Sequence, residues 1–287
     1  MREALARLAS PCDVAGALQA ATAALGADGR LEAELLLGEL LALDRIGLLR
    51  ERQLALAPAA RARFHDLLAR RLDGVPLAYL LGRREFWSLE FAVDARVLIP
   101  RPETEGLVEL GAELAARAPA GPILDLGTGS GAVAVVLARE CEARCVFAVD
   151  DSAAALEVAR ANAARHVAGR VAFIASDWCA AVAPASAALI VSNPPYVEDA
   201  YPGLTTAALC HEPRRALASG PDGLDAIRRI VDDGWRCLVP DGWLALEHGA
   251  GQGPAVRALL TARGYVDVAT RRDLAGLERI SAGRRPG

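Results

Sequence analysis

The stretch Ile123-Leu124-Asp125-Leu126-Gly127-Thr128-Gly129-Ser130-Gly131 decides the fold of this 287-residue chain. An apolar strand runs directly into a glycine-rich turn, and the apolar sequence from Ala132 to Ala138 that follows is typical of a helix. Glycines let a backbone approach a ligand closely, and a helix N-terminus attracts an anionic group. The stretch therefore predicts a cofactor site at the first turn of an α/β sheet.

A carboxylate stands at the expected distance from this turn. Asp150 closes the apolar strand Cys145 to Val149, nineteen residues after Gly131, where it can hold both hydroxyls of a ribose. The same spacing also satisfies the dinucleotide fingerprint, because Gly127, Gly129 and Ala132 match its glycine pattern. Local pattern alone therefore leaves both NAD and S-adenosylmethionine open.

A second motif, Ser192-Asn193-Pro194-Pro195-Tyr196, follows the apolar run Ala187 to Val191. The two prolines cannot donate to a strand ladder, so they end the strand and hold the residues before them extended. The Asn193 side-chain oxygen and the Pro194 backbone oxygen then become two fixed acceptors for a planar NH2 group. We expect Asn193 and Pro194 to be catalytic, and we expect Pro195 and Tyr196 to bind the substrate with them, the Tyr196 ring lying flat against its plane.

Two features favour S-adenosylmethionine as the cofactor. Gly131 adds a third closely spaced glycine that suits an amino-acid moiety, and hydride transfer would not use an amine cradle. A further strand, Val171 to Ala175, ends in Ser176-Asp177-Trp178, where Trp178 can cover an adenine ring and Asp177 can accept from its amine. The predicted cofactor-binding residues are Gly127, Thr128, Gly129, Ser130, Gly131, Asp150, Trp178 and Asn193.

Strands and helices alternate from residue 120 to the C-terminus, which predicts a doubly wound, mostly parallel sheet. Its last strand is expected near Tyr265 to Thr270. Ligands of such sheets bind at the carboxyl ends of the strands, and Asn193 stands at such an end.

The chain divides into three predicted parts. Residues 1–75 form a small helical bundle with breaks that include Pro11 and Gly26 to Gly29, and residues 76–100 form a β-hairpin linker that turns at Asp94-Ala95-Arg96. Residues 101–287 form the α/β domain, beginning with a helix that runs to about Arg117.

Composition limits the class of function. Hydrophobic residues make up 53% of the chain, yet none of its apolar runs reaches the roughly 20 residues of a membrane span, so we expect a cytoplasmic protein. The net charge of −4 does not suit a general nucleic-acid binder. The four histidines and six cysteines are scattered, which predicts no metal site.

With both motifs placed, the chain resembles the HemK family, the protein-(glutamine) methyltransferases that modify peptide chain release factors. The resemblance is carried by Leu81 to Trp87, Ile99 to Glu105, Asp125 to Gly131, Ser176 to Trp178, Ser192 to Tyr196, Glu212-Pro213, and Glu247-His248-Gly249.

The resemblance implies a class I, Rossmann-like methyltransferase that uses S-adenosylmethionine. It implies that Asn193 to Tyr196 hold a substrate glutamine of a release factor, which the helical N-terminal domain helps to dock. DNA and RNA amine methyltransferases share the Asn-Pro-Pro-Tyr turn, so methyl transfer to adenine or guanine is the alternative. Such an enzyme would need a basic patch or a target-recognition insert.

Overall fold

The computed structural model describes residues 12–26, 29–206 and 209–287. The chain separates into two compact units. The first contains Met1–Gly82 and Thr205–His211, and the second contains Arg83–Leu204 and Glu212–Gly287. The predicted breaks at Pro11 and at residues 27 and 28 lie outside the described residues.

The first unit is helical, as predicted. Its helices are α2 (Val14–Leu25), α3 (Gly29–Leu41), α4 (Arg45–Arg50), α5 (Pro58–Leu72) and α6 (Leu77–Leu81). Asp13 and Asp44 cap two of them by accepting hydrogen bonds from Gly16 N and Gly47 N. Phe64 and Leu36 lie in the apolar core that the helices share, so burial of helix faces organises this unit.

The second unit is built on a seven-stranded sheet with the order β5-β4-β3-β6-β7-β9-β8. The strands are β3 (Ile123–Leu126), β4 (Val146–Asp150), β5 (Val171–Ala175), β6 (Ala187–Ser192), β7 (Leu238–Glu247), β8 (Val266–Arg272) and β9 (Glu278–Arg284). The first five are parallel, whereas β9 pairs antiparallel with both β7 and β8. The predicted mostly parallel, doubly wound sheet is confirmed.

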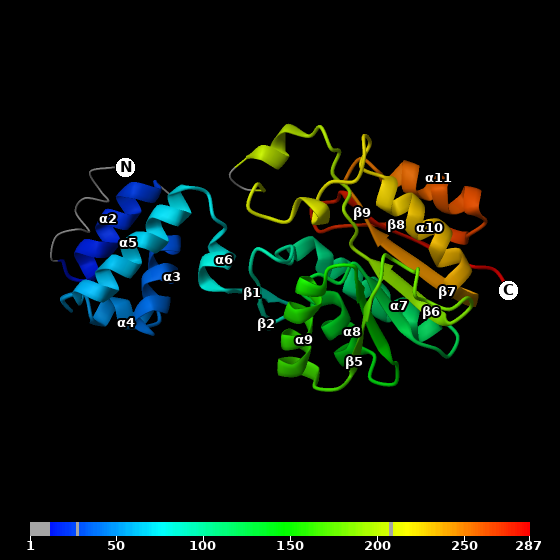
Figure 1. Ribbon diagram of the computed structural model, residues 1–287, viewed down its shortest axis with the longest axis horizontal. Coiled ribbons are helices and arrows are strands. Elements are labelled where there is room, and N and C mark those ends of the chain that lie inside the picture. Colours follow the sequence, from blue (N-terminus) through cyan, green and yellow to red (C-terminus); the bar gives the residue numbers. More distant parts are fainter. Residues whose placement is uncertain (1–11, 27–28, 207–208) are drawn as a thin grey trace. The chain divides into compact units, whose positions relative to one another are not determined.

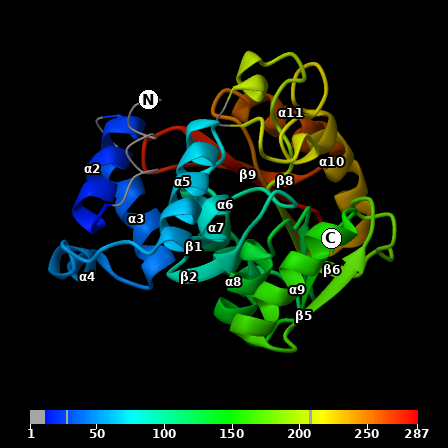
Figure 2. The ribbon, with the colours of Figure 1, turned by 60° about the vertical axis from the view of Figure 1, so that its left-hand side comes forward.

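Helices cover both faces of this sheet (Figures 1 and 2). On one face lie α7 (Glu105–Arg117), α8 (Ala132–Glu140) and α9 (Ala153–Val167), and on the other lie α10 (Asp225–Cys237) and α11 (Gly253–Arg263). The side chains of β3 alternate between the two layers, because Ile123 packs with the first group and Leu124 with the second. A strand buried on both faces explains the unbroken apolar runs in the sequence.

The predicted hairpin exists, but its predicted turn is wrong. Strands β1 (Arg83–Phe86) and β2 (Leu89–Ala92) are joined by Trp87 and Ser88, both with left-handed φ of 54° and 56°, and not by residues 94 to 96. This two-residue turn is held by side chains, since Glu85 accepts from Ser88 N at 2.6 Å and Glu105 accepts from Trp87 N at 2.9 Å.

The C-terminal part contains one strand more than predicted. The strand expected near Tyr265 to Thr270 is β8, and β9 follows it after a turn that Asp273 stabilises by accepting from Leu277 N. In β9 the side chains of Ile280 and Ala282 are buried against the sheet. Among the described helices, none is both long and apolar enough to cross a lipid bilayer.

Candidate active site

The glycine-rich turn lies where the strand order reverses. From β3 the sheet continues to β4 on one side and to β6 on the other, so the carboxyl ends of β3 and β6 border a crevice. Leu126 of β3 pairs in register with Ser192 of β6, and each is the last residue of its strand. Gly127 and Asn193, one residue further along each strand, therefore emerge side by side.

The turn itself requires glycine at Gly131. This residue is the N-cap of α8 and has a left-handed φ of 82°. A Cβ atom added there would lie 3.0 Å from the Cβ atom of Ala159 on α9. Any larger residue would therefore push the turn away from α9. Gly127 N and Thr128 N donate to Val149 O, which fastens the turn to β4.

Asp150 joins the turn to the end of β4. Its carboxylate accepts from Gly129 N at 2.9 Å and from Ser152 N at 2.9 Å. Each carboxylate oxygen retains a lone pair for a further donor, such as a ribose hydroxyl. Burial raises the pKa of Asp150, although these two backbone N–H groups oppose the rise.

Asp125 lies beneath the turn and does not face the crevice. It accepts from the Thr128 hydroxyl at 2.6 Å and from Ala134 N at 3.1 Å. Burial raises its pKa to about 7. Asp125 and Thr128 therefore brace the turn from inside.

The pocket in this crevice brings the two sequence motifs together. It is lined by the predicted residues Gly127, Gly129, Asp150, Trp178, Asn193 and Pro195, and by others that the predictions did not include: Arg96, Val97, Leu98, Asp151, Ser152, Ala155, Ser176, Pro213, Arg215 and Ala216, together with the candidate Asp177. The glycine turn and the Asn-Pro-Pro-Tyr turn thus face one pocket.

Within the part of the chain that the structure describes, other predicted residues are not among those that line the pocket. Thr128 and Ser130 are buried, and Pro194 is also buried. Tyr196 is half-buried against the second apolar layer, and its hydroxyl donates to Glu247 Oε1 at 3.5 Å. Burial raises the pKa of Tyr196 to about 12, so its phenol remains protonated at neutral pH.

Asn193 is held in one orientation by Thr104. Its Nδ2 atom donates to Thr104 Oγ1 at 3.1 Å, so Nδ2 points at Thr104. The side-chain oxygen Oδ1 is thereby directed away from Thr104. An amide held in this way has its oxygen free to accept a hydrogen bond.

Trp178 packs against the glycine turn. Its backbone is left-handed, with φ 48°, and its Cζ3 atom would lie 3.2 Å from a Cβ atom added to Gly127. Asp177 forms an ion pair with Arg229 at 2.9 Å. Trp178 lines the pocket, and an indole there suits a stacked aromatic ring.

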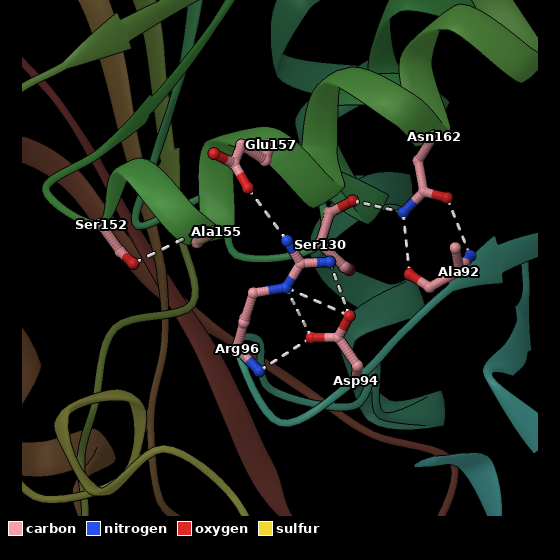
Figure 3. A network of polar contacts seen from close by, with 8 residues as sticks. All are labelled: Ala92, Asp94, Arg96, Ser130, Ser152, Ala155, Glu157 and Asn162. Carbon is pink, nitrogen blue, oxygen red and sulfur yellow. Dashed lines mark hydrogen bonds and ion pairs between the residues drawn. The ribbon is translucent and has the colours of Figure 1, made fainter. Parts of the chain in front are cut away.

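The β-hairpin and α9 together support the turn (Figure 3). Asn162 accepts from Ala92 N at 2.8 Å, donates to Ala92 O at 3.0 Å and donates to Ser130 O at 2.9 Å. Arg96 pairs with Asp94 of the same loop and with Glu157 of α9 at 3.1 Å. Of the three residues predicted to form a hairpin turn, Arg96 therefore lines the pocket.

An ion pair between the buried Glu212 and the partly exposed Arg101 holds a second wall. Glu212 accepts from Ile99 N at 3.1 Å and pairs with the Arg101 guanidinium. It thereby joins the segment that contains Val97 and Leu98 to the segment that contains Pro213 and Arg215. Arg215 in turn pairs with Asp151 at the rim of the pocket.

Two domain families match the sequence in consecutive regions. The PrmC N-terminal domain matches residues 16–82, and the methyltransferase small domain matches residues 107–246. Among solved structures, the hMettl16 catalytic domain in complex with an RNA hairpin superposes with a TM-score of 0.58 over 77% of this chain and 80% of that one. At 15% identity this likeness shows the fold alone. The match to the methyltransferase small domain confirms the predicted methyltransferase fold.

Curated relatives match nearly the whole chain. A protein of Xylella fastidiosa named release factor glutamine methyltransferase is 46% identical over 258 residues, which cover 90% of this chain and 94% of the relative. A protein of Burkholderia pseudomallei with the same name is 46% identical over 263 residues, covering 90% and 92%. On this likeness, which extends through both sequence motifs and both units, the chain belongs to the release factor glutamine methyltransferase family.

Proposed function

We infer that this protein transfers a methyl group from S-adenosylmethionine to the side-chain amide nitrogen of a glutamine in a peptide chain release factor. The observation that carries the inference is the shared pocket of the glycine turn and Asn193. Family membership supplies the substrate class, since the relatives are named for methylating glutamine in release factors.

The residues of the pocket fit the methyl donor. The Asp150 carboxylate, which keeps accepting capacity beyond its two backbone bonds, would hold the ribose hydroxyls. The Trp178 ring would lie against the adenine, and the backbone at Gly127 and Gly129 would approach the amino-acid moiety. When bound, the donor supplies an electrophilic methyl group on a sulfonium.

The protein's part in the reaction is to position a poor nucleophile. An amide nitrogen is weakly nucleophilic because its lone pair is delocalised into the carbonyl. Asn193 Oδ1 would accept one N–H of the substrate amide and Pro194 O the other, which would orient the nitrogen towards the methyl group. Enclosure between Trp178 and the segment around Leu98 would exclude water from the sulfonium.

The helical unit is proposed to dock the release factor. Its sequence matches the PrmC N-terminal domain from residue 16 to residue 82. Five of its large apolar side chains are exposed: Leu31, Leu35, Ile46, Leu49 and Leu54. These side chains would supply apolar contact area to a bound release factor.

The direct test is incubation of the purified protein with isotopically labelled S-adenosylmethionine and purified release factors, followed by mass mapping of the labelled residue. We expect label on one glutamine side chain. A release factor with that glutamine replaced by alanine is the matched control and should remain unlabelled. Label that entered only nucleic acid would contradict the proposal. Absence of label from both the natural release factor and its alanine variant would also contradict it.

A further inference from the structure

Glu247 is a buried carboxyl that the mechanism above does not use. It is the last residue of β7, and it is 1% exposed. Its Oε1 atom accepts from the Tyr196 hydroxyl at 3.5 Å, whereas its Oε2 atom is buried and has no hydrogen-bond partner among the described residues. Burying a carboxyl without full hydrogen bonding lowers stability.

The sheet places Glu247 beside the Asn193 turn. Leu246 of β7 pairs in parallel register with Ser192 of β6. Glu247 and Asn193 are the next residues on these two strands. Neighbouring residues of a parallel pair project to the same side of the sheet. The Glu247 carboxyl and the Asn193 amide therefore lie on the same side, at the carboxyl ends of β7 and β6.

Thr104 contacts the Asn193 amide and also acts on the Glu247 carboxyl. It is 4% exposed, and its Oγ1 atom accepts from Asn193 Nδ2 at 3.1 Å. A hydroxyl has one proton to donate. That proton is available to the Glu247 carboxyl, whose ionised form the Thr104 hydroxyl stabilises.

The surroundings of Glu247 bring its ionisation close to neutrality. Burial raises the pKa of Glu247 to about 7, and the Thr104 hydroxyl, the Arg279 guanidinium and the Tyr196 hydroxyl oppose this rise. Glu103 is the other charged group that acts on it, and it raises the pKa further. The carboxyl therefore changes charge within the range in which the protein would work.

The direction of the Thr104 proton decides how the Asn193 amide lies. While that proton points at Glu247, only oxygen lone pairs remain for Asn193, so Nδ2 must face Thr104 and Oδ1 must face away. If the proton pointed at Asn193 instead, the amide would turn round and present its NH2 group to the substrate. Two NH2 groups facing each other cannot form a hydrogen bond.

We propose that Glu247 is a positioning residue for methyl transfer, which fixes the orientation of the Asn193 amide through Thr104 and holds the Tyr196 ring of the same turn. This role rests on the proposed function, because it specifies how that function's acceptor is aligned. Thr104 is the second positioning residue. Neither side chain needs to touch the substrate.

The first test compares steady-state kinetics of Glu247→Gln, Thr104→Val and Thr104→Ser, with release factor as substrate. The glutamine variant offers Thr104 an NH2 donor, and the valine variant removes the hydroxyl while keeping the shape. We expect kcat to fall roughly tenfold to a hundredfold in both, with the KM for S-adenosylmethionine within about twofold of wild type. Thr104→Ser, which keeps the hydroxyl, should restore most of kcat.

Glu113→Gln is the matched control. Glu113 lies on α7, the helix that follows Thr104. Its carboxylate forms an ion pair with Arg271, with 2.6 Å between the two groups, and neither residue lines the pocket. The same carboxylate-to-amide change should leave kcat unchanged there. If Glu247→Gln fails to fold, the comparison of Thr104→Val with Thr104→Ser decides the question.

Two further measurements separate alignment from mere stability. Glu247→Gln should cost little additional kcat in an Asn193→Ala background, because the group to be aligned is then absent. In wild type, kcat should fall as the pH drops through about 7 and Glu247 becomes protonated, and the glutamine variant should lose this dependence. Asp125, whose pKa is also about 7, is present in both proteins and cancels in the comparison.

Wild-type kcat in both Glu247→Gln and Thr104→Val, or a full additional loss in the Asn193→Ala background, would overturn this role while leaving the proposed function intact. Absence of glutamine methylation by the wild-type protein would overturn the proposed function itself, and the role of Glu247 with it.

Discussion

The Asn193 amide donates through Nδ2 to Thr104, so its oxygen is the atom available to a bound amide. Replacing Asn193 with alanine removes that acceptor. We expect turnover, measured with the donor saturating, to fall on the order of 10²-fold, since a preorganised hydrogen bond to the reacting group is lost. Calorimetry should show that the variant still binds the donor, because Asp150 and the glycine turn remain. Near-normal turnover would exclude the proposed alignment.

Asp125 makes the stability of the protein depend on pH. Burial raises its folded-state pKa from 3.8 to about 7, so the folded protein binds a proton that the unfolded chain has released. The stability from this group is complete below about pH 4 and is lost as the pH rises through about 7. As the pH rises from 5 to 8, the free energy of unfolding should therefore fall less in Asp125→Asn than in wild type. The difference between the two falls should be roughly 2 kcal/mol.

Urea denaturation at several pH values would measure this difference. Asp199→Asn, at an exposed position, serves as the control and should follow the wild-type curve. Parallel curves for wild type and Asp125→Asn would contradict a raised pKa at Asp125.

At the scale of elements, Asn162 joins α9 to β2 and to the glycine turn (Figure 3). Asn162→Ala leaves Ala92 N, Ala92 O and Ser130 O without their side-chain partner. We expect a loss of about 2 kcal/mol or more in the free energy of unfolding, since buried polar groups lose their hydrogen bonds. Donor affinity should fall with it, because the turn is then less firmly held.

Glu157→Gln, on the same helix, provides the comparison for this prediction. It breaks an ion pair with Arg96 in which both side chains are partly exposed, and such pairs contribute less than about 1 kcal/mol. Equal effects of the two substitutions, measured by urea denaturation and calorimetry, would contradict a special role for Asn162.

The elements that could be predicted from the sequence are those specified by local patterns. The apolar runs of β3 and β6, the glycines after β3 and the prolines after β6 each limit the backbone on their own. The turn at Trp87 and Ser88 could not be predicted, because it contains neither glycine nor asparagine and is held by the distant Glu105. Strand β9 was not predicted because it contains few apolar residues, and its strand conformation depends on pairing with β7.

The same distinction applies to the candidate site. Gly127, Asp150, Trp178 and Asn193 stand in recognisable motifs, and the structure brings them to one pocket. Arg215 could not be assigned a place there, because an ion pair with Asp151 at the rim of the pocket holds it. Thr104 could not be assigned a contact with Asn193, because 89 residues separate the two in the sequence.

At the scale of the whole molecule, the helical unit should determine how well the release factor binds. Ile46 and Leu49 of α4 are each 58% exposed. Replacing both with aspartate should raise the KM for release factor roughly tenfold, since apolar contact area is lost, while kcat and donor affinity stay unchanged. Leu274→Asp, in an exposed turn of the second unit, should leave all three quantities unchanged. An unaltered KM in the double variant would place the docking surface elsewhere.

The segment Thr205–His211 belongs to the helical unit, although the residues on both sides of it belong to the methyltransferase unit. Within the helical unit, His211 Nε2 bonds to Asp73 O at 3.2 Å. A fragment that begins after Gly82 would therefore still contain the seven residues Thr205–His211, but would lack the helical unit to which they belong. A minimal enzyme for engineering needs a second edit, a short flexible bridge from Leu204 to Glu212.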